Sequence, residues 1–267
     1  MNTDINSREE QLKAFGRLLE VMDTLREKCP WDRKQTNESL RPNTIEETYE
    51  LCDALLKNDT ANICKELGDV LLHIVFYAKI GSEQGAFDIA DVCNKLCDKL
   101  IYRHPHVYGD VSVNGTEQVL QNWEQLKTKE KDGNKTVLSG VPDALPSVIK
   151  ADRIQEKASN VGFDWQDRHD VWAKVKEEIG EFETEIESMD RDKATREFGD
   201  IMFSLINAAR LYHINPDTAL EHTNQKFISR FNYVEQKAKE SGRQIKELTL
   251  EEMDKYWNEA KSVKNIR

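Results

Sequence analysis

One acidic pattern occurs twice in this chain, with the same spacing each time. It reads E-E-x-x-E, then fifteen residues, then E-x-x-D, and its acids are Glu46, Glu47, Glu50, Glu66 and Asp69 in the first copy and Glu177, Glu178, Glu181, Glu197 and Asp200 in the second. The sequences that begin at the fourth acid are also similar, with ELGDVLLHIVFYA at 66–78 and EFGDIMFSLINAA at 197–209. This repetition predicts two copies of one folding module.

The spacing of the acids fits α-helices. Positions four apart on a helix differ by about 40° and positions three apart by about 60°. Glu46 and Glu50 therefore share one helix face, and Glu66 and Asp69 share a face of the next helix. Two such helices packed antiparallel would bring four carboxylates to one point.

Carboxylates held this close repel one another and raise one another's pKa. A bound Mg²⁺ would remove that cost, because it favours oxygen ligands in octahedral geometry at about 2.0–2.1 Å. The alternative is a solvated acidic helix face, which is the usual fate of a glutamate cluster. Two copies with identical spacing favour the metal site.

Composition narrows the class of protein. At 267 residues the chain suits two domains, and its 12 glycines and 6 prolines favour helices over a turn-rich β fold. The net charge of −11 argues against nucleic acid and anionic membranes as partners. No apolar run reaches about 18 residues and residues 1–10 do not resemble a signal peptide, so we expect a cytoplasmic protein.

The cysteines argue against a disulfide framework. All of them, Cys29, Cys52, Cys64, Cys93 and Cys97, lie in the first half, and their number is odd. Cys93 and Cys97 do not have the C-x-x-C spacing of zinc sites. We expect five reduced thiols, mostly at packing positions.

Apolar periodicity predicts the helices and the domain boundaries. Helices are expected at about residues 7–28, 60–80, 89–102 and 123–129, and again at about 151–160, 171–187, 195–211, 219–239 and 249–264. Ser7 and Glu10 resemble a capping box, and Thr44 is the expected N-cap of the first acidic helix. Gly133, Gly140, Pro142 and Pro146 indicate a linker at 131–147 between modules at 1–130 and 148–267.

Basic and aromatic residues repeat along with the acids. Lys99 and Arg103 are matched by Lys226 and Arg230, and a Trp-x-x-x-Lys pattern occurs at 123–127 and 257–261. A basic pair four apart lines one helix face and can bind phosphate oxygens, or it forms surface ion pairs with nearby glutamates. A tryptophan such as Trp257 can stack on a base or pack in the core.

These residues resemble the MazG family of nucleoside triphosphate pyrophosphohydrolases, in the all-α NTP pyrophosphatase superfamily. The acidic signature is that of the superfamily, and CPWDRKQT at 29–36, RHPHVY at 103–108 and VGFDW at 161–165 resemble the two-domain bacterial type. The resemblance implies an all-α fold of tandem helical-bundle modules that form a homodimer. It also implies Mg²⁺-dependent hydrolysis of NTPs or dNTPs to monophosphate and pyrophosphate, with Mn²⁺ able to substitute and broad base tolerance.

The resemblance also implies site residues, chiefly in the second module. The metal ligands would be Glu178, Glu181, Glu197 and Asp200, and the catalytic residues Glu177, Glu178, Lys226 and Arg230. Substrate would contact Lys174, Val175, Lys176, Glu177, Glu178, Lys193, Ala194, Thr195, Arg196, Asp200, Lys226, Phe227, Ile228, Ser229, Arg230 and Trp257. A possible second site comprises Glu47, Glu50, Glu66, Asp69, Lys99 and Arg103.

The first module keeps every acid, and the residues alone do not exclude activity there. The residues just before its glutamates differ: the first module has Thr44 and Ile45 where the second module has the region around Lys176. The resemblance implies a structural or regulatory role for it. In the expected mechanism, metal-bound carboxylates place a water that attacks the α-phosphorus, and Lys226 and Arg230 neutralise the departing oxygens.

Three alternatives stay open. A di-iron enzyme would use Glu-x-x-His pairs, but no histidine here lies three residues after a glutamate, and His73 lies in an apolar run typical of a core. A helical scaffold with acidic partner-binding surfaces is the second alternative. The third is a pyrophosphatase specialised for one nucleotide.

Overall fold

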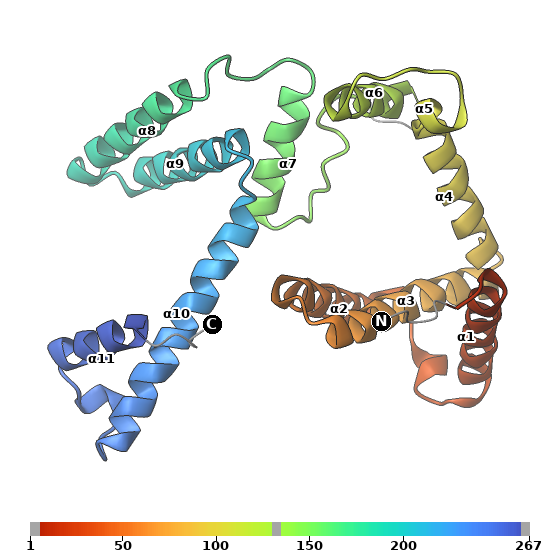
Figure 1. Cartoon of the computed structure of the whole chain (residues 1–267), viewed down its shortest axis with the longest axis horizontal. Helices are drawn as coiled ribbons and strands as arrows, with labels where there is room; N and C mark the ends of the chain where they lie inside the picture. Colours follow the sequence, from red (N-terminus) through yellow and green to blue (C-terminus); the bar gives the residue numbers. More distant parts are fainter. Residues whose placement is uncertain (1–5, 130–134, 263–267) are drawn as a thin grey trace. The chain divides into compact units, whose positions relative to one another are not determined.

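The structure is a computed structural model that describes residues 6–129 and 135–262 (Figure 1). All the regular elements in these two ranges are helices, which confirms the predicted all-α class. The chain divides into two compact units, Met1–Val111 and Ser112–Arg267. Within the predicted linker at 131–147, residues 131–134 lie outside the described residues, and the module boundaries at 130 and 148 stay predictions.

The first unit is built around a helical hairpin. Its helices are α1 (Arg8–Lys28), α2 (Asn37–Lys57), α3 (Thr60–Glu83), α4 (Ile89–Arg103) and the short α5 (Pro105–Tyr108). Ser7 and Glu10 form the predicted capping box of α1. The hydrophobic core joins α1, α2 and α3 through Met22, Leu40, Val75, Phe76 and Ile80. His73 is buried, and its Nδ1 lies 3.1 Å from Thr44 Oγ1, as a core histidine would.

The start predicted for the first acidic helix was wrong. Thr44 lies inside α2, where its Oγ1 donates to Leu40 O, rather than at the N-cap. The helix begins after Thr36, whose hydroxyl accepts from the backbone N–H of Ser39 in a reciprocal capping box. Pro42 removes one backbone donor in the second turn, and the helix nevertheless continues to Lys57.

The second unit repeats the hairpin. It contains α6 (Thr116–Lys129), α7 (Ser147–Ser159), α8 (Asp170–Glu187), α9 (Arg191–Leu211), α10 (Pro216–Glu240) and α11 (Leu250–Ser262). The hairpin turns are alike in detail. Asn58 and Met189 both adopt a left-handed conformation, with φ of 53° and 59°. The next residues, Asp59 and Asp190, are the N-caps of α3 and α9. The duplication therefore extends to backbone conformation.

The helix α11 packs on α10 and completes the second unit. Phe227 and Trp257 face each other with ring centroids 5.1 Å apart. Arg243 binds Glu252 through two hydrogen bonds of 2.7 and 2.9 Å, and this pairing lowers the pKa of the Glu252 carboxyl to about 2. The α11 contacts lie on the part of α10 that extends away from α8 and α9 (Figure 1).

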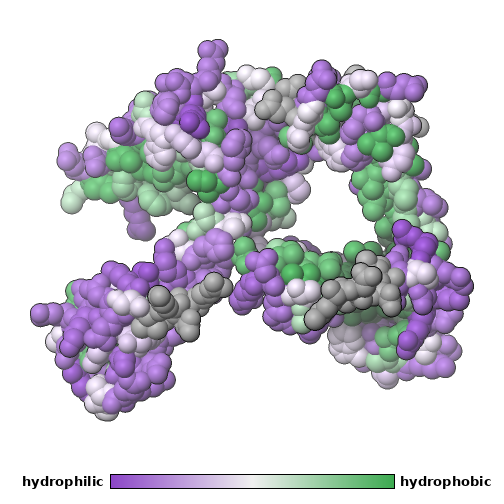
Figure 2. Space-filling view, viewed as in Figure 1, coloured by the Kyte–Doolittle hydropathy of each residue, from purple (hydrophilic) through white to green (hydrophobic). Residues whose placement is uncertain are grey.

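Many large apolar side chains remain at the surface of both units. In the second unit they include Ile186, Phe198, Met202, Leu205, Phe227 and Ile228, and Figure 2 shows apolar surface over α8 and α9. The five cysteines are free, but four are exposed, so the expected packing role was wrong for those four. Among the described helices, none is long and apolar enough to cross a membrane.

Candidate active site

The α8–α9 hairpin brings three of the four predicted metal ligands together. Glu178, Glu197 and Asp200 each place a carboxylate oxygen within 4.8 Å of the other two. Glu178 comes from α8, one turn after the buried Val175, and is itself only 7% exposed. Burying a charge without a partner is costly, so this carboxylate needs a cation.

Lys174 supplies a cation to this cluster. Its Nζ lies 2.7 Å from Glu178 and 2.9 Å from Glu177, one helical turn away on α8. Hydrogen bonds to these two carboxylates raise the pKa of the lysine well above its usual value. Lys174 thus stays charged and offsets part of the acidic cluster.

Glu181 lies beside the cluster without belonging to the group of three. Its pKa is raised, first by loss of solvent and then by the nearby charges of Glu178 and Glu197. A cation bound among these acids would relieve that repulsion. The four predicted ligands are therefore neighbours, as the helical spacing indicated.

The first unit holds an equivalent cluster on α2 and α3. Glu47, Glu66 and Asp69 meet within the same 4.8 Å limit, and the pKa of Glu47 is raised by loss of solvent and then by Asp69, Glu50 and Glu66. Its lysine has a different origin: Lys65, on α3, lies 2.8 Å from Glu66 and 3.5 Å from Asp69. Sequence reasoning missed Lys65, although its spacing of four from Asp69 is a recognisable helix pair.

One buried oxygen of Glu66 indicates that these residues suit a divalent cation. Glu66 is 5% exposed, and its Oε2 is buried with no hydrogen-bond partner among the described residues, while Oε1 accepts from Lys65. An unpaired buried carboxylate oxygen is strongly unfavourable unless an ion binds it. Carboxylate donors from two helices are the ligand type that Mg²⁺ and Mn²⁺ prefer. The residues fit the expected metal.

The predicted phosphate-binding pair lies on α10. Arg230 has its guanidinium 5.7 Å from the centroid of the Trp257 ring, and Phe227 stacks against Phe231 at 6.1 Å. Lys226, Ile228 and Ser229 share this helix, and Lys226 and Ile228 are exposed. The structure therefore brings Arg230, Phe227 and Trp257 together, in a cluster on α10 and α11.

The remaining predicted residues are spread over three elements. Lys193, at the start of α9, pairs with Glu185 and Asp190 at 3.7 and 3.5 Å. Ala194 and Thr195 line an open cavity of about 460 Å³ with Phe182 and Phe198. Val175 is buried, Lys176 and Arg196 are exposed, and Lys99 and Arg103 lie on α4 of the first unit.

Comparison with known proteins identifies the family. A model described as the MazG nucleotide pyrophosphohydrolase domain matches this chain twice, at residues 35–108 and 166–235. The chain belongs to the MazG nucleotide pyrophosphohydrolase family. The two matches contain the two acidic clusters, so the MazG domain is duplicated in tandem and each copy carries one candidate metal site.

Two relatives of similar length support this assignment. The MazG nucleoside triphosphate pyrophosphohydrolase/pyrophosphatase of Thermotoga maritima is 43% identical over 92% of this chain and 95% of its own length. A nucleoside triphosphate pyrophosphohydrolase of Escherichia coli is 40% identical over 94% of this chain and 98% of its own. YabN of Bacillus subtilis, a protein described as uncharacterized, is 48% identical over 87% of this chain and 48% of its own length. The chain is thus a metal-dependent nucleoside triphosphate pyrophosphohydrolase.

Proposed function

We propose that the chain hydrolyses nucleoside and deoxynucleoside triphosphates to the monophosphate and pyrophosphate with Mg²⁺, tolerating different bases. The observation that carries the proposal is the group formed by Glu178, Glu197 and Asp200, whose oxygens lie within 4.8 Å on two helices of one hairpin. Its physiological role would be to clear unwanted nucleotides in the cytoplasm.

Each acid has a role in this reaction. Glu178, Glu181, Glu197 and Asp200 would hold the cation, which when bound offsets the charge of the phosphate oxygens. Glu177, on the neighbouring position of α8, would orient the attacking water. One water is consumed, the bond between the α-phosphorus and its bridging oxygen breaks, and pyrophosphate leaves. Lys174 is close enough to Glu178 to donate to a phosphate oxygen beside it.

The basic pair on α10 would bind the phosphates that leave. Lys226 and Arg230 are one turn apart, and Arg230 is held by its contact with Trp257. Neutralising the departing pyrophosphate oxygens is the role that basic side chains have in phosphoryl transfer.

A homodimer is the proposed assembly. Ile186 of α8 and Phe198 of α9 are 53% and 51% exposed. Figure 2 shows apolar surface over these two helices. Contiguous apolar surface on a water-soluble enzyme is typical of a protein interface. The elution volume of the purified chain with in-line light scattering gives its mass directly, and a monomer would contradict this part of the proposal.

Product analysis tests the reaction. The chain is incubated with ATP and each dNTP, with Mg²⁺ or with EDTA, and the products are separated. We expect monophosphate and pyrophosphate, formed only when the metal is present. Diphosphate and orthophosphate would mean cleavage at the γ-phosphorus and would contradict the proposal.

The first unit would also bind the metal, and its buried oxygen gives a test. Replacing Glu66 by Gln keeps the side-chain volume and removes a buried charge, one of whose two oxygens has no hydrogen-bond partner among the described residues. Since the ion pair with the largely exposed Lys65 is lost as well, we expect little change in stability without metal. Binding of Mg²⁺ to the parent at a hundred times its dissociation constant should add about 2.7 kcal/mol. The variant should lose that gain, as measured by hydrogen exchange of the α2–α3 hairpin.

The matched control is Glu46→Gln, which changes an exposed acid of α2, in the same hairpin but outside the group of three. It should keep the full stabilisation by Mg²⁺. Equal stabilisation of both variants by the metal would remove Glu66 from the ligand set.

A further inference from the structure

The helix α11 has only a small buried face. Among its described residues Ala260 alone is buried, and an alanine contributes little apolar area. Figure 1 shows α11 folded back beside the distal part of α10, after the turn that follows Glu240. A helix with so little buried surface depends on directional polar contacts for its exact position.

Arg243 is fixed at the point where α10 ends. Gly242 adopts a left-handed conformation, with φ of 74°, and the N–H of Arg243 donates back to Ala238 O at 3.1 Å. Helices commonly end in this way, and the bond to the preceding turn keeps the reversing chain in order. Arg243 therefore leaves α10 at a defined place, and its side chain reaches across to α11.

Glu252, in the first turn of α11, binds this side chain. The Arg243 guanidinium donates to the two carboxylate oxygens of Glu252 at 2.7 and 2.9 Å. Oε2 of Glu252 also accepts from the N–H of Thr249 at 2.8 Å, and the N–H of Glu252 donates to Thr249 Oγ1 at 3.3 Å in a capping box. Because two parallel hydrogen bonds fix direction as well as distance, the pair sets both the start and the rotation of α11.

The rotation of α11 decides where Trp257 lies. In the structure its ring is 5.7 Å from the guanidinium of Arg230 and 5.1 Å from the Phe227 ring. An arginine this close to a tryptophan ring is attracted to its face and is restrained by it. A shift of α11 by one residue would rotate Trp257 by about 100° and break this contact. The orientation of Arg230 therefore depends on the position of α11.

The Arg243–Glu252 pair contributes geometry more than stability. Arg243 and then the N–H of Thr249 lower the pKa of the Glu252 carboxyl to about 2, so the carboxylate is charged at neutral pH. Both side chains are partly exposed, and exposed ion pairs add little to the free energy of folding. Loss of the pair should therefore leave the chain folded.

The first copy of the repeat lacks this pair. Counted back from the matching tryptophans, Glu252 corresponds to Gln118. No lysine or arginine occurs between Arg103 and Trp123, the residues that match Arg230 and Trp257. The arginine and the tryptophan are thus repeated, while the ion pair that fixes one against the other belongs to the second copy.

We infer that Arg243 and Glu252 are positioning residues that hold Trp257 against Arg230 and so orient its guanidinium toward the phosphates, an inference that rests on the proposed function. Neither residue of the pair needs to touch the substrate. They act through α11, which they fix at its first turn, and through the tryptophan that this helix carries.

Calorimetric titration with Mg²⁺ and inorganic pyrophosphate tests the inference, on the full chain in a Glu66→Gln background that removes one acid of the first-unit cluster. Arg243→Gln removes the guanidinium and keeps the capping box of Thr249 and Glu252. We expect the dissociation constant of pyrophosphate to rise about tenfold, as when one hydrogen bond to a charged group is lost. Glu252→Gln should have a similar effect, because glutamine also completes a capping box but carries no charge.

The matched control is Glu251→Gln, at the exposed acid next to Glu252 on the same helix. It should leave pyrophosphate binding unchanged. Arg243→Lys keeps the charge but not the paired hydrogen bonds, so its dissociation constant should lie between those of the parent and Arg243→Gln.

Arg230→Ala shows whether the pair acts through Arg230. In an Arg230→Ala chain, Arg243→Gln should cause no further loss, because residues that act as a unit are not additive. An equal loss with and without Arg230, or no loss in either, overturns the inference. Unchanged binding in Arg230→Ala itself would contradict the proposed role of that arginine and the inference with it. Since the titration needs no turnover, a chain that binds as expected but does not hydrolyse triphosphates would count against the proposed reaction only.

Discussion

Replacing Glu178 or Glu197 by Gln is expected to lower kcat/KM for nucleoside triphosphates more than about a hundredfold, the range seen when a central electrostatic group is lost. Each substitution keeps the side-chain volume and removes one ligand charge from the group of three. Glu178→Gln also deprives Lys174 of its 2.7 Å partner. Steady-state rates with Mg²⁺, in a Glu66→Gln background, measure the effect on the second unit alone.

The control for this prediction is Glu183→Gln, an exposed acid of α8 outside the group of three. It should keep nearly full activity. Raising the Mg²⁺ concentration should recover part of the lost rate if weakened metal binding is the cause. Near-normal turnover in both Glu178→Gln and Glu197→Gln would show that these acids are not the metal ligands.

Replacing Phe76 by Ala is expected to destabilise the first unit by about 3–5 kcal/mol, the usual cost of truncating a buried phenylalanine. Phe76 is 2% exposed and packs with Met22, Leu40, Val75 and Ile80. The truncation leaves a cavity among them and removes the ring beneath Arg26. Urea unfolding, followed by hydrogen exchange of each unit separately, measures the loss.

The chain contains its own control for this substitution. Asn207 occupies the matching position of α9 and is partly exposed, so Asn207→Ala should cost the second unit only about 1 kcal/mol, mainly the contact with Arg210. Similar losses in the two variants would mean that the matching positions have the same structural role, contrary to the packing described here.

The parts of the fold that depend on local patterns were predictable. Hairpin helices, their acidic faces and the meeting of Glu178 with Glu197 and Asp200 follow from spacing, because helical periodicity places those side chains. The helix start at Thr36 was missed, since Thr44 before a run of glutamates is also a plausible N-cap. Both threonines are possible N-caps by sequence, and the structure uses Thr36, which forms a capping box with Ser39.

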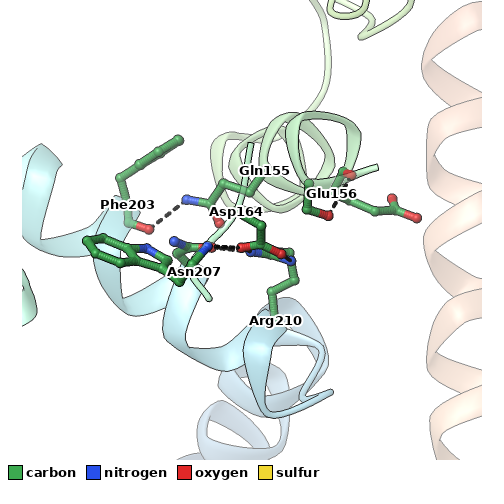
Figure 3. Close-up of polar contacts among 8 residues, drawn as sticks. Gln155, Glu156, Asp164, Phe203, Asn207 and Arg210 are labelled. Atoms are coloured by element: carbon green, nitrogen blue, oxygen red, sulfur yellow. Dashed lines mark hydrogen bonds and ion pairs between the residues drawn. The ribbon is translucent and has the colours of Figure 1, made fainter. Parts of the chain in front are cut away.

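The features that depend on tertiary packing were not predictable. The contact of Arg230 with Trp257 joins α10 and α11, and Gln155 and Asn207 line one cavity because α7 packs on α9 (Figure 3). The two copies of the repeat also differ at one position that similarity alone does not explain: Phe76 in the first copy is matched by Asn207 in the second. The fate of such a position depends on neighbours that are distant in the sequence.

The two lysines beside the acids have a further consequence. Lys174 and Lys65 reach equivalent clusters from different helices, so the internal counter-ion of the acids is placed differently in the two units. A divalent ion held by these carboxylates would take the place of the ammonium group as their counter-charge. The lysine would then be free to pair with a phosphate, so we expect metal and nucleotide to bind cooperatively.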